Sequence, residues 1–172
     1  MLYTSCQASK LLKKLNEDRT ALLTQENRSR SFIAASSEDI ESLRPEYDYI
    51  ATQKKIDDFD VKIRTIRHAI NVFNSTHEVE GTGMTIDQVL IAMPMLREKK
   101  EKLYRMKERL PKVRARSGGL GNNIIEYDYV NYDIRDVVKD YEEASTQLTK
   151  LQIALDRTNN TDQFEIDVVY EG

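Results

Sequence analysis

The clearest hydrophobic pattern in the chain is a repeat of seven residues between residues 45 and 74. Two series follow it, spaced like the two apolar positions of a heptad: Tyr49, Ile56, Ile63 and Ile70, and Thr52, Phe59, Ile66 and Phe73. Charged residues such as Lys54 and Asp57 lie outside both series. The pattern predicts a long helix, about residues 45–74, that packs along another helix.

Three further helices are predicted from apolar spacing. A second repeat of seven predicts a helix at about 134–157. Its members are Ile134, Tyr141, Leu148 and Leu155, and the apolar residues between them are Val137 or Val138, Ala144 and Leu151. Apolar residues three and four apart predict shorter amphipathic helices at about 5–26 and 86–110. In the latter helix, residues 97–102 (Arg-Glu-Lys-Lys-Glu-Lys) are interpreted as a solvated face whose charges pair at four-residue spacing.

Capping residues and prolines mark the expected helix boundaries. Two pairs have the spacing of a capping box, which satisfies free N–H groups at a helix start: Thr4 with Gln7, and Thr85 with Gln88. Pro45 suits the first helical turn, where its missing N–H costs nothing. Pro94 is expected to kink the helix at 86–110. Asp133 is expected to cap the last helix.

The rest of the chain contains short alternating segments. Alternation of Ile125, Tyr127 and Tyr129 predicts a strand that pairs with residues 112–116 across the glycine-rich residues 118–121, forming a β element at about 112–130. Residues 32–35 are predicted to form another short strand. The C-terminal arm, 161–172, alternates apolar and polar residues and is interpreted as an edge strand or a partner-binding arm.

These elements predict a mainly α protein. Its amphipathic helices must cover one another, which favours an antiparallel helical-hairpin or coiled-coil bundle of about four helices with a small β-hairpin element. At 172 residues the chain fits one helical domain, residues 1–172. Because a long, thin bundle has a limited core, we also expect subunits to share apolar surface in a homo-oligomer.

Composition narrows the classes of function. The net charge is −3, from 26 basic and 29 acidic residues, whereas a general nucleic-acid binder usually has a basic excess. No apolar run is long enough for a membrane-spanning helix, and the N-terminus lacks the pattern of a secretion signal. We therefore expect a cytoplasmic protein that does not bind nucleic acid, and this composition argues against membrane binding.

Candidate catalytic chemistry is sparse. His68 and His77 are nine residues apart, which is not the four-residue spacing of a helical zinc pair. Cys6 is the single cysteine and has no evident histidine partner. The sequence therefore predicts a non-enzymatic protein with no metal and no cofactor.

Basic, aromatic and glycine residues converge near the predicted hairpin. Arg114 and Arg116 are expected to hold an anion, and Tyr127, Tyr129 and Tyr132 to offer rings for stacking. Arg28 and Arg30, which follow the first helix, are expected at the same end of the bundle. The alternative interpretation is structural: glycine clusters usually mark turns, and alternating tyrosines usually lie half-buried on a sheet.

Several segments resemble the septicolysin-like family of small bacterial helical proteins, over roughly residues 50–165. The similar segments are Ile70-Asn71-Val72-Phe73-Asn74, Gly83-Met84-Thr85-Ile86, Arg116, Ile125-Glu126-Tyr127 and Tyr132-Asp133-Ile134. The resemblance implies a helical fold and marks Asn71 and Asn74 as shared positions. The family name implies membrane-lytic activity.

Three functions follow from these observations. The first is a homo-oligomeric binding protein that holds a small anionic, nucleotide-derived molecule at the Arg/Tyr/Gly-loop site, for example to sequester a signalling nucleotide in a conflict between phage and bacterium. The second is a coiled-coil scaffold or protein-interaction module. The third is a membrane-active, pore-forming protein, as the family name implies.

Overall fold

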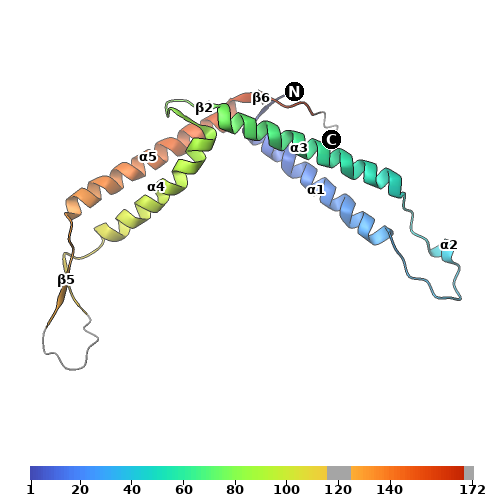
Figure 1. The fold of residues 1–172 in the computed structure, drawn as a ribbon, viewed down its shortest axis with the longest axis horizontal. Coiled ribbons are helices and arrows are strands. Elements are labelled where there is room, and N and C mark those ends of the chain that lie inside the picture. Colours follow the sequence, from blue (N-terminus) through green and yellow to red (C-terminus); the bar gives the residue numbers. More distant parts are fainter. Residues whose placement is uncertain (116–124, 169–172) are drawn as a thin grey trace. The chain divides into compact units, whose positions relative to one another are not determined.

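The computed structural model of the protein describes residues 1–115 and 125–168 of the 172-residue chain. These residues form a mainly α structure with small β elements, which confirms the predicted fold class (Figure 1). The helices are α1 (Ser5–Ser29), α2 (Ile40–Leu43), α3 (Tyr49–Thr76), α4 (Ile86–Lys107) and α5 (Ile134–Thr161). The antiparallel strand pairs are β1 (Leu2–Thr4) with β6 (Gln163–Glu165), β2 (Glu78–Val79) with β3 (Met84–Thr85), and β4 (Lys112–Arg114) with β5 (Tyr127–Tyr129). None of the described helices is both long and apolar enough to cross a membrane.

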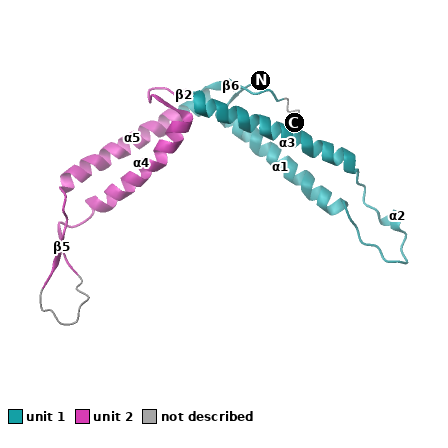
Figure 2. Ribbon diagram, in the orientation of Figure 1, with its two compact units in different colours: residues 1–77, 157–172 teal, residues 78–156 magenta. Residues whose placement is uncertain are grey.

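The chain divides into two compact units (Figure 2). Unit 1 contains residues 1–77 and 157–172, and unit 2 contains residues 78–156. Two long helices lie side by side in each unit, α1 with α3 in unit 1 and α4 with most of α5 in unit 2, and each pair has its own hydrophobic core. The single domain at 1–172 stays a prediction, to which the structure adds this internal division.

The core of unit 1 lies between α1 and α3. The apolar repeat of α3 faces it as predicted, and the buried members are Ile56, Ile63, Ile66 and Phe73. Leu15 of α1 and Ile66 are fully buried. Tyr49 is the exception, because it is the first residue of α3 and stays 63% exposed. The repeat therefore packs from Ile56 onward.

Polar contacts set the direction of this helix pair. Gln53 donates a hydrogen bond to Glu26 (2.6 Å), and Arg19 pairs with Asp60 (2.6 Å). Positions later in α1 thus meet positions earlier in α3, so the two helices are antiparallel. This is the helical hairpin that the sequence predicted.

The two ends of the described chain close unit 1. β1 pairs with β6, and the Phe164 ring of β6 stacks on Phe73 of α3 at a centroid distance of 4.4 Å. Ile166 and Val168 continue the alternation and are buried in the core of unit 1. The edge-strand interpretation of the C-terminal segment is therefore confirmed for β6.

Two local predictions in unit 1 are wrong. Residues 32–35 form no strand, and the connection instead contains the short helix α2. Pro45 does not lie in the first turn of α3. That helix begins at Tyr49 because the Asp48 carboxylate accepts the N–H of Ala51 (3.0 Å) and caps it there.

Unit 2 repeats the same arrangement with α4 and α5. Its core contains Leu103 of α4 with Val137 and Ala144 of α5, so the apolar repeat of α5 faces α4. Of the two valines that the spacing left open, Val137 is buried and Val138 is 36% exposed. Pro94 lies inside α4, and the helix continues through it.

The predicted caps are present in both units. Thr4 with Gln7 and Thr85 with Gln88 each form a complete capping box. The Asp133 carboxylate accepts the N–H of Arg135 (2.8 Å) at the start of α5. These local contacts explain why the predicted helix starts at 5, 86 and 134 agree with the structure.

Candidate functional site

A β-hairpin in unit 2 gathers basic and aromatic side chains on one face. β4 and β5 pair so that Arg114 lies opposite Tyr127 and Lys112 lies opposite Tyr129. Residues two apart on a strand share a face, and so do directly opposite residues of an antiparallel pair. These four exposed residues, which we call the hairpin face, form the structural counterpart of the predicted Arg/Tyr site.

Lys112 lies against both tyrosine rings of the hairpin face. Its Nζ is 3.9 Å from the ring centroid of Tyr127 and 5.3 Å from that of Tyr129. The negative face of an aromatic ring attracts an ammonium group, so this contact holds the lysine close. Tyr127 is 44% exposed and Tyr129 is 61% exposed. Tyr129 is therefore the more open ring for another planar group.

The hairpin is held at the end of α4. Arg109, just beyond α4, forms an ion pair with Asp128 of β5. The N–H of Val130 donates to the carbonyl of Pro111 (3.2 Å), which extends the pairing of β4 and β5. The stem of the hairpin is thus fixed to unit 2 by polar contacts as well as by its strand ladder.

Of the three predicted tyrosines, Tyr132 has a different role. Its hydroxyl donates a hydrogen bond to the carbonyl oxygen of Met106 (2.9 Å), and its ring packs against the core of unit 2. Lys112, by contrast, belongs to the hairpin face but was not among the predicted residues. The alternation that groups Arg114 with Arg116 also includes Lys112, so the signal was present in the sequence.

The remaining predicted residues are not part of the described hairpin face. Arg116 and the glycines at 118–121 lie outside the described residues. Arg28 and Arg30 lie at the end of α1, in unit 1. Asn71 and Asn74 belong to α3, also in unit 1, where Asn71 is exposed and Asn74 half-buried.

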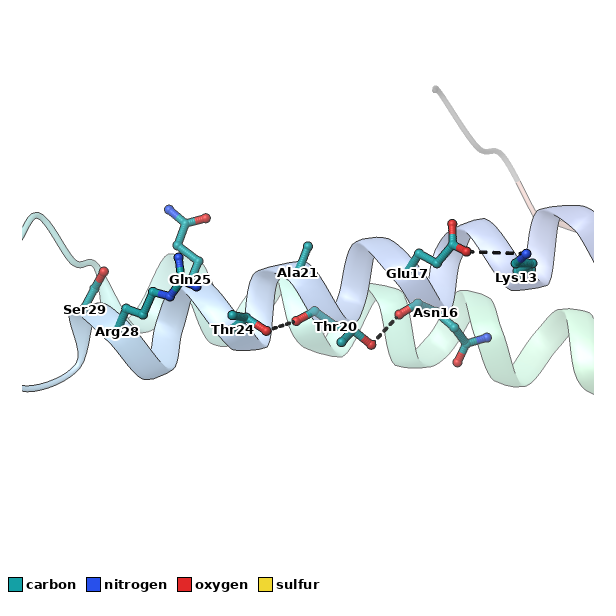
Figure 3. Close-up of a pocket in the computed structure, with 9 residues that line it drawn as sticks. All are labelled: Lys13, Asn16, Glu17, Thr20, Ala21, Thr24, Gln25, Arg28 and Ser29. Atoms are coloured by element: carbon teal, nitrogen blue, oxygen red, sulfur yellow. Dashed lines mark hydrogen bonds and ion pairs between the residues drawn. The ribbon is translucent and has the colours of Figure 1, made fainter.

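Arg28 lines a groove along α1, with a volume of about 790 Å³ (Figure 3). All of the described residues that line it come from this one helix. The hydroxyls of Thr20 and Thr24 donate to backbone carbonyls four residues earlier (2.7 and 2.8 Å), and Lys13 pairs with Glu17 (3.8 Å). Several of its polar groups therefore already form contacts within α1.

A cleft of about 460 Å³ between α4 and α5 was missed by the sequence analysis. We call it the α4–α5 cleft, and its lining residues are Arg97, Lys100, Glu101, Tyr104, Arg105, Tyr141 and Leu148. Arg97, Lys100 and Glu101 belong to residues 97–102, which were predicted to be a solvated face with paired charges. Among the ion pairs of the described residues, none includes Arg97 or Lys100, so that pairing is wrong for these two cations; Arg105 likewise has no ion pair there.

A second cleft in unit 2 is mainly apolar and has a volume of about 640 Å³. We call it the apolar cleft. Met95 and Leu96 of α4, Leu151 of α5 and Met84 of β3 contribute to its lining. Met95 is 65% exposed, which is unusual for so large an apolar side chain. Contiguous apolar surface of this kind typically marks an interaction site.

Candidate catalytic or metal-binding groups stay isolated. The part of the chain that the structure describes contains no group of three or more His, Cys, Asp or Glu side chains able to hold a metal ion. His68 is exposed on α3. His77 stacks on Phe73 (4.4 Å), and its Nε2 lies 2.7 Å from Asp162. This last contact joins the end of α3 to the residue that follows α5 within unit 1.

Comparison with known proteins bears on the fold alone. No family model and no curated protein sequence match the chain. The crystal structure of a functionally unknown conserved protein from Corynebacterium diphtheriae is similar, with a TM-score of 0.55, 16% identity, and coverage of 96% of this chain and 100% of that one. At this identity the likeness shows a shared fold. The resemblance to the septicolysin-like family stays a prediction.

Proposed function

We propose that this chain is a non-enzymatic, homo-oligomeric binding protein that holds a small anionic, nucleotide-like molecule on the hairpin face. One observation carries the proposal: the register of β4 and β5 puts two cations and two tyrosine rings on a single exposed face. A protein that binds its ligand without chemically converting it is suited to sequestering that ligand.

The spacing of the hairpin face fits such a ligand. Arg114 and Tyr129 are diagonal neighbours on the strand pair, and diagonal neighbours are about 7–8 Å apart. Arg114 is placed to hold a phosphate with two parallel hydrogen bonds, while a base stacks on the open ring of Tyr129. Both side chains can therefore contact one nucleotide at the same time.

Lys112 would change partners when the ligand binds. In the free protein its ammonium group lies over the Tyr127 ring. A phosphate brought to Arg114 offers a full negative charge in place of a ring quadrupole, and charge-assisted hydrogen bonds are the stronger contacts. Lys112 then joins Arg114 on the phosphate and uncovers the Tyr127 ring.

Calorimetric titration with a panel of cyclic and linear nucleotides tests the proposal. A charge-assisted hydrogen bond contributes roughly 1.5–3 kcal/mol, so Arg114→Ala should weaken binding at least about tenfold. Tyr129→Ala should weaken it by a similar factor, because stacking contributes about 1–3 kcal/mol per base. The matched control is Arg67→Ala, which removes one exposed arginine from α3.

Two results would refute the hairpin site. One is that no nucleotide of the panel binds the parent protein. The other is that Arg114→Ala and Tyr129→Ala bind as tightly as Arg67→Ala does. Circular dichroism of each variant, which should match the parent, excludes unfolding as the cause of lost binding.

A second candidate function, a protein-interaction module, is supported by the apolar cleft. Its exposed Met95 and its apolar lining favour coverage by another chain, and we propose a second copy of this protein as the partner. Met95→Asp should then lower the mass measured by light scattering towards 20.0 kDa. Ile153→Asp is the matched control, because Ile153 on α5 is also 65% exposed and does not line the cleft.

The same measurement tests the homo-oligomer in both candidate functions. The parent should have a mass that is a multiple of 20.0 kDa at micromolar concentration. A parent mass of 20.0 kDa would refute self-association in both candidate functions. If Met95→Asp and Ile153→Asp lowered the measured mass equally, the apolar cleft would not be part of the interface.

A further inference from the structure

The α4–α5 cleft combines walls from two helices with an unusual set of side chains. Arg97, Lys100 and Arg105 all line it from α4, within eight residues of one another. Tyr141 and Leu148 of α5 are seven residues apart and share a face opposite them. Its volume of about 460 Å³ lies within the 300–1,000 Å³ typical of small-molecule sites.

The cations of the α4–α5 cleft leave positive charge uncompensated. Three cationic side chains and a single carboxylate, Glu101, line it, although the whole chain has a net charge of −3. In unit 1, by comparison, Arg19, Lys13 and Lys62 are each paired with a carboxylate. Concentrated charge of one sign within a cleft attracts a ligand of the opposite sign.

The aromatic side of the cleft adds a second recognition element. The rings of Tyr104 and Tyr141 have centroids 6.1 Å apart and are tilted by 49°. Lys100 lies 5.7 Å from the Tyr141 centroid. Leu148 adds apolar surface one helical repeat further along α5. A planar ring bound here would contact tyrosine and leucine while its charged substituent reaches the cations.

We propose that the α4–α5 cleft is a binding site for a small aromatic anion that carries one phosphate, such as an aryl phosphate or a nucleoside monophosphate. Arg97 and Arg105 hold the phosphate, and Tyr104 and Tyr141 contact the ring. With three cations and the carboxylate of Glu101, the lining has a net charge of +2, which is close to compensating one phosphate monoester at pH 7. The site does not depend on the hairpin face, whose residues it does not share.

Site-resolved NMR titration of the full chain tests this proposal. Phenyl phosphate, inorganic phosphate and phenol serve as probes, and backbone amide shifts report where each one binds. Phenyl phosphate should shift the amides of residues 97–105 and 141–148 saturably. Inorganic phosphate and phenol should each bind at least tenfold more weakly, because each has only one of the two recognised groups.

Paired variants separate a specific site from general charge attraction. Arg97→Gln combined with Arg105→Gln should weaken phenyl phosphate at least tenfold. Arg64→Gln combined with Arg67→Gln makes the same change at two exposed positions of α3 and should leave affinity unchanged. All four positions are exposed, so folding is expected to be retained, and amide spectra of the free variants verify it.

Each contrary outcome has a distinct meaning. Equal affinity of the two double variants would overturn the site. Equal affinity for phenyl phosphate and inorganic phosphate would overturn the aromatic ligand class. Shifts confined to residues 112–114 and 127–129 would overturn the cleft while supporting the hairpin face, so failure of one site is distinguishable from failure of the other.

Discussion

Ile66 of α3 offers the most direct test of how unit 1 is held together. Its side chain is fully buried between α1, α3 and the C-terminal segment. Truncation to alanine removes three carbons, and at about 0.8 kcal/mol per buried methylene this costs about 2.4 kcal/mol. The cavity left behind adds to this loss, so Ile66→Ala should lower the free energy of unfolding by about 2–5 kcal/mol.

Val61 supplies the matched control on the same helix. It is 49% exposed, so Val61→Ala removes two carbons that are already about half solvated and should cost about 0.8 kcal/mol. Urea unfolding followed by circular dichroism measures both variants, with the midpoint expected to shift while the slope stays constant. The harsher Ile66→Asp buries a carboxylate without a partner and should unfold the protein.

The difference between the two truncations is the decisive quantity. A midpoint shift for Ile66→Ala no larger than that for Val61→Ala would show that the α1–α3 interface is not the core of unit 1. A folded Ile66→Asp protein with unchanged mass would show that this side of α3 faces water. Either result would refute the reasoning from the seven-residue repeat.

Three further predictions concern single contacts. Hydrogen bonds from Thr161 and then His77 hold the pKa of Asp162 below its ordinary 3.8, so its stabilising contribution should be complete above that pH and disappear as the pH falls below it. Asp162→Asn should therefore be less stable than the parent at pH 7, and the difference should shrink as the pH falls below 3.8; a pH-independent difference in urea unfolding would contradict this. Tyr132→Phe removes a hydrogen bond to a backbone carbonyl of α4 and should cost about 1 kcal/mol, whereas an unchanged unfolding midpoint would show that water replaces the bond. Gly81 has φ of 74° with nothing within 4 Å of an added Cβ, so Gly81→Ala should cost about 1–2 kcal/mol in thermal or urea unfolding through backbone strain alone; no loss would show that the turn relaxes.

The candidate site could be predicted from the sequence only in part. Alternation correctly paired residues 112–114 with 127–129, although twelve residues separate the two strands, because the period of two within each strand is a local property. The role of Tyr132 was not predictable, because its hydroxyl bonds to a carbonyl 26 residues away. The α4–α5 cleft was missed for a similar reason: Tyr141 meets Tyr104 only because α5 packs on α4.

The positions of the long helices, and the apolar stripe of each, follow from local sequence. These properties depend on residues within a few positions of one another: the seven-residue repeat of α3, the capping boxes at Thr4 and Thr85, and the Asp133 cap. Pro45 and residues 32–35 show the limit of such signals. The Asp48 cap starts α3 after Pro45, and residues 32–35 pair with none of the described strands.

The choice of which apolar stripes cover one another comes from packing and not from local sequence. Four amphipathic helices can be paired in several ways, and their stripes are equally apolar in each, so the choice depends on burial summed over whole interfaces. The structure pairs α1 with α3 and α4 with α5. It also joins residues 165 positions apart, where the Met1 amino group donates to the Ile166 carbonyl (3.0 Å). No local pattern encodes such contacts, because they form only once the helices have brought the two ends together.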